Sequence, residues 1–450
     1  MYKYLSLLND LETQIQTNEY KEGEKLPSIR SLAESCQINK STVIRAFHEL
    51  EKKNLVYSVP QSGYFVVKKA FELSENEKTE IDFETSAPDW NKFPYIDFQH
   101  CINKAIDTYQ KDLFVYGRPQ GLMSLIKVVQ KHLETYQVFT KTENIFITSG
   151  VQQALSILRE IPFPNKKTKI LVEQPSYHLF MEHLETYQES LIGIKRTAEG
   201  IDLLELERIF REEDIKFFYT MPRFHNPLGT SYSQKEKKEI ARMAKKYDVY
   251  IVEDDYLVDF EQDSKADPIF TYDLNDYVIY LKSYSKIIFP GLRIGVAVIP
   301  NQLKERFLLY KKINDIESSM ISQAALEIYI KSGMFERHRQ KIKDSYVSRA
   351  KQLYQSVIKY TDDSPELVKV IQPASVCMHN HIVLHKSINL QQLIRNLNKK
   401  GVMVEPISRN YLTSFQQEKI LKLNVSHVEE HKIEEGVRIV IEEIRRLGNV

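Results

Sequence analysis

The sequence has few cysteines and no long apolar run, and both absences exclude classes of protein. Its three cysteines (Cys36, Cys101 and Cys377) are odd in number and far apart in a chain of 450 residues. They form neither a zinc pattern nor a disulfide framework, so we expect a cytoplasmic protein without a metal site. No apolar run approaches the roughly 20 residues that span a bilayer. The first residues lack a small-residue cleavage site, so we expect no signal peptide.

A strong net charge is also missing, because the formal value is only +1. Any binding to nucleic acid must therefore depend on a local basic patch. The length is too great for one ordinary hydrophobic core and suits two or three domains. We expect a small domain over residues 1–69, an acidic and polar linker over residues 70–92, and a large domain over residues 93–450.

Residues 1–69 show three helical patterns followed by two strand-like runs. Ser28 is placed to cap the second helix and Asn39 to cap the third. The third helix has an apolar face and, opposite it, the polar or basic side chains of Lys40, Ser41, Thr42 and Arg45. Two short helices, the second with a basic N-terminal half, have the layout of a helix-turn-helix.

The run YSVPQSGYFVV predicts two short strands that turn through Gln61, Ser62 and Gly63, which would form a wing. From Cys36 to Lys69 there are six basic and two acidic residues, a local excess of four. Such an excess supplies the phosphate neutralisation that DNA binding needs. On periodicity alone, a helical module that binds another protein remains the alternative.

The string EGEKLPSIRSLAES, followed by INKSTVIRAFHELEKKNLVYSVPQSGYFV, resembles the winged helix of the GntR family of bacterial regulators. The resemblance covers nearly all of residues 10–67. It implies contacts with DNA by Arg30, Lys40, Ser41, Thr42, Arg45 and Gly63. The family's usual wing reads Gly-Ser-Gly, whereas this chain has Gln61 at the first position.

Short β-rich runs recur through the middle of the chain, separated by helical patterns. The runs are NIFIT, KILVE, KFFYTM, VYIVED, VIYLK and RIGVAVI. Strands that alternate with helices predict an α/β domain with a mostly parallel sheet and helices on both faces. In such a sheet, functional residues gather at the carboxyl ends of the strands.

Five successive strand ends carry a set of groups that suits one cofactor. In chain order these are the turn Ser149-Gly150-Val151 at a helix start, Tyr177, Asn226, the pair Asp254 and Asp255, and Lys286. Pyridoxal 5'-phosphate needs a lysine for its aldehyde, a carboxylate for its ring nitrogen, an aromatic face, and amides with an arginine for its phosphate. Singly, each feature has a plainer explanation as a cap, a turn or a surface charge. Their order at successive strand ends favours the cofactor.

The motifs SGVQQAL, EQPSYHLF, HNPLG, VEDDY and SYSKIIFPGLRIG resemble those of fold-type I aminotransferases over roughly residues 85–445. A GntR-like head on such a domain is similar to the MocR subfamily of transcriptional regulators. The resemblance implies an internal aldimine between Lys286 and pyridoxal phosphate. It also implies a large subdomain over about residues 117–300 and a small one over about residues 301–450.

The same resemblance implies the other cofactor contacts. The phosphate would be held by Ser283, Arg293, Val151, Gln152 and, from the neighbouring subunit, Tyr116; the phenolic oxygen by Asn226 and Tyr256; the ring by Tyr177 and Asp254. Asp255 remains an alternative to Asp254, because EDDY fixes the carboxylate only to within one residue. The match at Tyr116 implies a homodimer, head-to-tail as in the subfamily.

The chain departs from the aminotransferases where they bind the substrate's carboxylate with an arginine. Lys422 stands at that position, and a lysine lacks the planar grip of a guanidinium. Arg409, in the preceding loop, is a candidate substitute. Alternatively, Lys422 lies at a strand surface and the aligned arginine is elsewhere. Cofactor contacts combined with a weakened substrate grip indicate a sensor rather than a metabolic enzyme.

We therefore expect a regulator that binds DNA and pyridoxal phosphate and senses the cofactor, an amino acid or an amine through Lys286. One alternative is a catalytically active aminotransferase with a DNA-binding head. Another is a winged-helix repressor whose large domain serves only dimerisation.

Overall fold

A computed structural model describes residues 3–53, 55–59, 62–67, 80–263, 266–362, 366–370 and 377–448. The chain divides into two compact units, Met1–Lys78 and Thr79–Val450. Within the described ranges, no helix combines the length and the apolar content needed to cross a membrane. Gln61 of the expected wing and residues 70–79 of the expected linker lie outside the described residues.

The first unit contains three helices and a two-stranded hairpin. Its elements are α1 (Lys3–Gln16), α2 (Ile29–Ser35), α3 (Lys40–Lys52), β1 (Val56–Val59) and β2 (Gly63–Val66). The strands are antiparallel, with Val59 opposite Gly63. The Ser28 hydroxyl accepts a hydrogen bond from the Ser31 amide at 3.1 Å, which confirms the expected cap of α2. Asn39 occupies the N-cap position of α3, but its side chain makes no capping bond.

The second unit is built on an eight-stranded sheet. In spatial order its strands are β4 (Ile145–Thr148), β11 (Gly295–Val298), β10 (Val278–Ser283), β9 (Tyr250–Asp254), β8 (Ile215–Thr220), β5 (Lys169–Gln174), β6 (Leu191–Thr197) and β7 (Gly200–Ile201). The strands β10, β9, β8, β5 and β6 run parallel, whereas β11 and β7 are antiparallel to their neighbours. The expectation of a mostly parallel sheet is confirmed.

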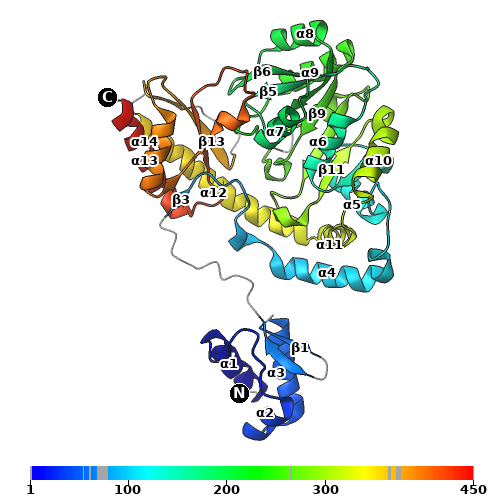
Figure 1. Cartoon of the computed structure of the whole chain (residues 1–450), viewed down its shortest axis with the longest axis vertical. Coiled ribbons are helices and arrows are strands. Elements are labelled where there is room, and N and C mark those ends of the chain that lie inside the picture. Colours follow the sequence, from blue (N-terminus) through cyan, green and yellow to red (C-terminus); the bar gives the residue numbers. More distant parts are fainter. Residues whose placement is uncertain are drawn as a thin grey trace. The chain divides into compact units, whose positions relative to one another are not determined.

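Helices cover both faces of this sheet (Figure 1). They are α4 (Tyr95–Tyr109), α5 (Met123–Glu134), α6 (Val151–Glu160), α7 (His178–Thr186), α8 (Leu203–Glu212), α9 (Gln234–Tyr247), α10 (Asn301–Asp315) and α11 (Met320–Lys331). Alternate residues of β8 serve opposite faces, since successive strand side chains point to opposite sides. Phe217 packs in the core with α6 and α7, whereas Phe218 packs with α8 and α9.

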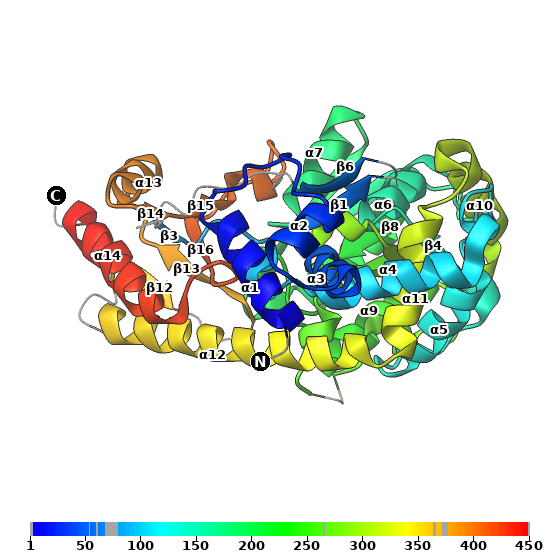
Figure 2. The same cartoon turned by 90° about the horizontal axis from the view of Figure 1, so that it is seen from below.

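A smaller sheet forms a second subdomain of this unit. Its strands, in order, are β12 (Val368–Val370), β13 (His379–Leu384), β16 (Ile420–Asn424) and β15 (Glu405–Pro406), and its helices are α13 (Leu390–Lys399) and α14 (Glu430–Gly448). The long helix α12 (Met334–Thr361) runs from α11 to α14, as Figure 2 shows. It thereby joins the two sheets of the second unit.

Residues 81–92, which the sequence places in the linker, belong instead to the second unit. The strand β3 (Ile81–Asp82) pairs with β14 (Val402–Met403), and the Phe83 ring is fully buried. Further along, Asp89 forms an ion pair with Arg349 at 3.0 Å. The linker interpretation was wrong for these residues. The run Ile81-Asp82-Phe83-Glu84 alternates apolar and acidic residues, but it is too short and too acidic to predict a strand by itself. Pairing with the distant strand β14 stabilises it.

Candidate functional site

A cavity of about 280 Å³ lies at the carboxyl ends of the large sheet's strands. It is lined by Ser86, Ala87, Gly150, Val151, Gln152, Tyr177, Met221, Asn226, Asp254, Tyr256, Ser283, Ser285, Lys286, Pro290 and Arg293. Nine of the ten residues that the sequence assigns to cofactor contacts are among them. The tenth, Tyr116, lies away from this cavity with 82 % of its surface exposed.

One end of the cavity offers donors for an anion. The helix α6 begins at Val151, directly after Gly150, and directs its free backbone amides into the cavity. Gly150 has a φ of +83°, and a Cβ there would lie 2.9 Å from a guanidinium nitrogen of Arg293. That guanidinium donates to the Ser149 carbonyl at 3.0 Å, so it is held beside the helix start. Together with the Ser283 hydroxyl, these groups suit a phosphate.

Asp254 supplies a carboxylate at the other end of the cavity. It is only 3 % exposed, and its Oδ2 accepts a hydrogen bond from the Tyr219 hydroxyl at 2.8 Å. Its Oδ1 finds no hydrogen-bond partner among the described residues. Burial raises the pKa of this carboxyl to about 7; Asp255 also raises it, and the Tyr219 hydrogen bond opposes the rise. A buried carboxyl with one unpaired oxygen suits a cationic N–H group of a ligand.

The structure separates Asp254 from Asp255, which the sequence could not do. Asp255 is fully buried and does not line the cavity. Its carboxylate pairs with the Arg223 guanidinium and accepts a hydrogen bond from the Tyr280 hydroxyl at 2.7 Å. Asp254 is therefore the carboxylate that a ligand in this cavity can reach.

Lys286 lies in the serine-flanked turn after β10. Its Nζ donates a hydrogen bond to the Ser86 carbonyl. Burial lowers the pKa of Lys286 to about 8; Lys422 lowers it further, whereas Glu405 opposes the shift. Only the neutral amine attacks an aldehyde carbon, so the lowered pKa increases the reactive fraction at neutral pH.

Tyr177, Asn226 and Tyr256 complete the cavity wall. The Tyr177 hydroxyl accepts from the Gln152 amide at 2.8 Å, and the Tyr256 hydroxyl donates to the Phe224 carbonyl at 3.0 Å. The Asn226 Oδ1 is buried and has no hydrogen-bond partner in the described part of the chain. Two rings are thus fixed in place, and an amide is available to a ligand.

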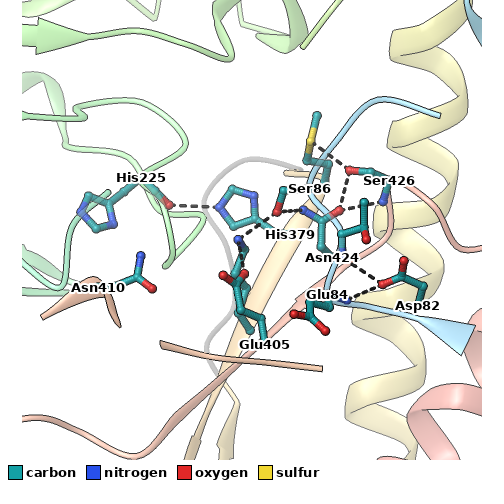
Figure 3. Close-up of polar contacts among 12 residues, drawn as sticks. Asp82, Glu84, Ser86, His225, His379, Glu405, Asn410, Asn424 and Ser426 are labelled. Carbon is teal, nitrogen blue, oxygen red and sulfur yellow. Dashed lines mark hydrogen bonds and ion pairs between the residues drawn. The ribbon is translucent and has the colours of Figure 1, made fainter. Parts of the chain in front are cut away.

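Two histidines of the small sheet hold the loop that carries Asn226. His379 donates from Nε2 to the His225 carbonyl at 3.1 Å, a contact visible in Figure 3. His381 donates from Nδ1 to the Leu228 carbonyl at 2.7 Å. Burial lowers the pKa of His381 to about 4, and that of His379 falls well below its usual range, so both rings are neutral.

The two candidates for binding an effector's carboxylate are both engaged by carboxylates of the chain itself. The Lys422 Nζ lies 3.0 Å from the Glu405 carboxylate and 3.0 Å from the Ser86 hydroxyl. Arg409 forms an ion pair with Glu182 at 2.7 Å. Lys422 is buried in the small sheet, so its placement at a strand surface facing solvent is excluded.

Ser86 and Ala87 are site residues that the sequence interpretation missed. Both fall within the expected linker, yet both line the cavity. The Ser86 hydroxyl also accepts a hydrogen bond from the Asn424 side chain at 3.1 Å (Figure 3). The apolar Phe83, three residues earlier, is the one hint in the sequence that this segment enters the fold, but it does not place Ser86 in the cavity.

In the first unit, the residues expected to contact DNA occupy α2, α3 and the hairpin. Lys40, Ser41 and Arg45 are exposed and Thr42 is partly exposed, while the opposite face of α3 (Val43, Ala46, Phe47 and Leu50) is completely buried. The Arg45 guanidinium lies over the Tyr4 ring, 4.1 Å from its centre. Arg30 is exposed on α2, and Gly63 begins β2 with a φ of +116°.

Comparisons with known proteins match both units. Residues 81–440 match the family described as aminotransferase class I and II, and residues 3–66 match the bacterial regulatory proteins of the gntR family. The HTH-type transcriptional regulator YcxD of Bacillus subtilis (strain 168) is 54 % identical, over 98 % of this chain and 99 % of that protein.

Two aminotransferases extend the comparison for the second unit. Aromatic-amino-acid aminotransferase 1 of Thermococcus litoralis is 27 % identical, over 78 % of this chain and 85 % of that protein. The solved structure of the kynurenine aminotransferase of Pyrococcus horikoshii has a TM-score of 0.73 at 26 % identity. That match covers 82 % of this chain and 91 % of the other.

Proposed function

Because the chain belongs to the aminotransferase class I and II family and carries a gntR-family head, we propose that it is a DNA-binding regulator that senses an amine through pyridoxal phosphate. The head joined to an aminotransferase domain is the architecture of the MocR subfamily. The observation that carries the proposal is the cavity in which Lys286, Asp254 and Arg293 lie around one space.

The residues of the cavity fit pyridoxal 5'-phosphate, the cofactor that this family implies. Asp254 has a buried, unpaired oxygen for the ring N–H, and Arg293 with the start of α6 would hold the phosphate. The other contacts would come from Lys286 at the aldehyde carbon, Tyr177 at the ring face, Asn226 and Tyr256 at the phenolic oxygen, and Ser283, Val151 and Gln152 at the phosphate. When bound, the cofactor supplies an electrophilic carbon that primary amines attack.

Ser86 supports a route from the cavity toward the head. Its carbonyl accepts a hydrogen bond from Lys286, and that contact must change once the lysine nitrogen bonds to carbon. Ser86 lies between β3 and Asp89, both of which anchor the segment. The segment is continuous in sequence with the residues that join the two units. A ligand that changes the bonding of Lys286 would therefore act on the segment that holds Ser86, provided that it binds the two bonding states of Lys286 with different affinity.

A homodimer is part of the proposal. Ile96 on α4 and the run Phe114, Val115 and Tyr116 are large apolar side chains with more than half of their surface exposed. Large apolar side chains that are exposed in this way are typical of an interaction surface. A head-to-tail pair of chains would cover it, bring Tyr116 to the partner's phosphate site, and present two heads to paired half-sites of DNA.

Cofactor and amine are expected to change the DNA affinity of the full chain about fivefold or more, the lower range of a typical coupling between two sites. The measurement is fluorescence anisotropy with a duplex that the wild-type protein selects from a randomised pool. Lys286→Ala is the matched control and should not respond. If the DNA affinity of wild-type chain with covalently bound cofactor does not change when amine is added, the chain does not sense the amine.

Turnover of an amino acid with a 2-oxo acid at about 1 per second or faster would then support the aminotransferase alternative.

Arg45→Ala is expected to weaken DNA binding by about tenfold to a hundredfold, because α3 presents this exposed guanidinium beside Lys40 and Ser41. Lys53→Ala is the matched control, since Lys53 is paired with Glu12 at 2.5 Å just beyond the far end of α3. The same duplex is titrated at several salt concentrations. Equal losses in the two variants would mean that α3 does not present Arg45 to the DNA.

A further inference from the structure

Among the described residues, each cation in or near the cavity already has a partner in the chain or a role in the proposed function. Among the described residues that line it, the cationic side chains are Lys286 and Arg293. In the proposed function, Lys286 bonds to the cofactor's carbon and Arg293 holds its phosphate. Close by, Lys422 faces Glu405 at 3.0 Å and Arg409 faces Glu182 at 2.7 Å.

The pair of Lys422 and Glu405 is fixed by the register of two strands. Glu405 on β15 lies directly opposite Lys422 on β16, so both side chains share one face of the small sheet. That face meets the cavity, because Lys422 also contacts Ser86 and influences the pKa of Lys286. The Lys422 side chain is 6 % exposed and that of Glu405 is 19 % exposed, so water screens the pair little.

A ligand carboxylate at this position is disfavoured on two counts. If it binds Lys422 beside Glu405, two like charges share a shielded space, which costs binding free energy. If it displaces Glu405, the protein's own carboxylate is left unpaired and largely buried. A ligand with a neutral hydroxyl in place of the carboxylate brings no second negative charge and does not displace Glu405. Neutral hydrogen-bonding groups lie beside Lys422 and Glu405, namely the Asn424 amide and the Ser86 hydroxyl.

We propose that the effector is a primary amine without a carboxylate, and that Glu405 is the residue that excludes amino acids by neutralising Lys422. The inference rests on the proposed function, because it concerns the amine that exchanges with Lys286. In that exchange the bond from the Lys286 nitrogen to the cofactor's carbon breaks, and the amine nitrogen bonds to the same carbon. The two protons that the amine loses pass to Lys286, so no oxidant or reductant is required.

The test uses pairs of amines that differ only in a hydroxymethyl group or a carboxylate: ethanolamine and glycine, 3-aminopropanol and β-alanine, 4-aminobutanol and 4-aminobutanoate. Each is titrated into the full chain loaded with pyridoxal phosphate, and the visible absorption reports the exchange at Lys286. The same titration with free cofactor corrects for the intrinsic reactivity of each amine. We expect half-saturation at an about tenfold lower concentration of the amino alcohol in each pair, since like charges in a shielded site cost at least this much.

Glu405→Gln keeps the shape of the side chain but leaves the charge of Lys422 unpaired. The half-saturation concentration of each amino acid, relative to that of its amino alcohol, should therefore fall by about tenfold. Lys422→Gln should weaken the amino acids further and leave the amino alcohols nearly unchanged. Glu434→Gln is the matched control, because Glu434 forms an exposed ion pair with Lys359 at 2.7 Å. It should leave the relative half-saturation concentrations of the paired amines unchanged.

Three results would overturn the inference: a wild-type preference for the amino acids, relative half-saturation concentrations that Glu405→Gln leaves unchanged, or a loaded protein whose spectrum responds to no amine. In all three cases the chain still binds pyridoxal phosphate, so cofactor binding, as part of the proposed function, is not contradicted. A chain that shows no visible absorption after incubation with pyridoxal phosphate and removal of the unbound excess would instead refute the proposed function, and the inference with it.

Discussion

Lys286→Ala is expected to abolish covalent binding of pyridoxal phosphate, so that the visible absorption of the loaded chain disappears completely. Lys286 is the lysine that lines the cavity among the described residues, and burial lowers its pKa to about 8. About a tenth of this amine is neutral at pH 7, whereas an ordinary lysine with a pKa of 10.5 is neutral only to a few parts in ten thousand. No other lining side chain can provide an amine nitrogen.

The measurement is the absorption spectrum of the chain after incubation with cofactor and removal of the unbound excess, followed by borohydride reduction and peptide mapping. Wild-type chain should carry the fixed adduct on Lys286, and the alanine variant should carry none there. Lys286→Arg is the control for charge, because it keeps a cation but forms no bond to the aldehyde carbon. An adduct that persists on another lysine, or a spectrum that the alanine variant retains, would show that the cavity is not where the cofactor is bonded.

The sequence predicted which residues lie together around the cavity where their grouping depends on strand ends. Tyr177, Asn226, Asp254 and Lys286 follow strands that are far apart along the chain, yet a parallel sheet brings their carboxyl ends to one edge. Their grouping therefore follows from the alternation of strands and helices, without knowledge of any single contact. Their roles toward the cofactor stay predictions.

Ser86 and Glu405 could not be placed in this way, because their positions depend on pairings between distant segments. Ser86 enters the cavity only because β3 adds to β14, and the two strands lie at opposite ends of the second unit's sequence. Glu405 meets Lys422 only through the register of two short strands. No periodicity reveals a two-residue strand, since the pattern is shorter than one repeat of alternation.

The head was easier to predict, because its features are local. The helical spacing of apolar residues marks α1, α2 and α3, and the basic side chains fall on the exposed face of α3. The expected cap at Asn39 is not formed, because its side chain accepts no hydrogen bond from the backbone amides at the start of α3. Capping is a side-chain choice that the residue type favours but does not decide.

Asp254→Asn and Asp255→Asn are expected to have opposite effects, although the two residues are adjacent. The Asp254 carboxyl is buried with one unpaired oxygen, and its pKa is raised from 3.8 to about 7. Its ionised form is therefore disfavoured in the cofactor-free fold, which loses stability as the pH rises between these two values. An amide removes that cost, so Asp254→Asn should leave the melting temperature unchanged or higher at pH 7.

The same variant should release pyridoxal phosphate between about a hundredfold and a few thousandfold more readily, because a buried ion pair that loses one partner costs about 3–5 kcal/mol. Asp255→Asn should instead lower the melting temperature of the apo chain by about 5 °C or more, since it leaves the buried Arg223 guanidinium without its carboxylate. Thermal melts of both apo variants and dialysis of both loaded variants separate the two effects. If Asp255→Asn loses the cofactor while Asp254→Asn retains it, the carboxylates are assigned the wrong way round, because a ring nitrogen in this cavity can be paired only by the carboxyl that reaches it.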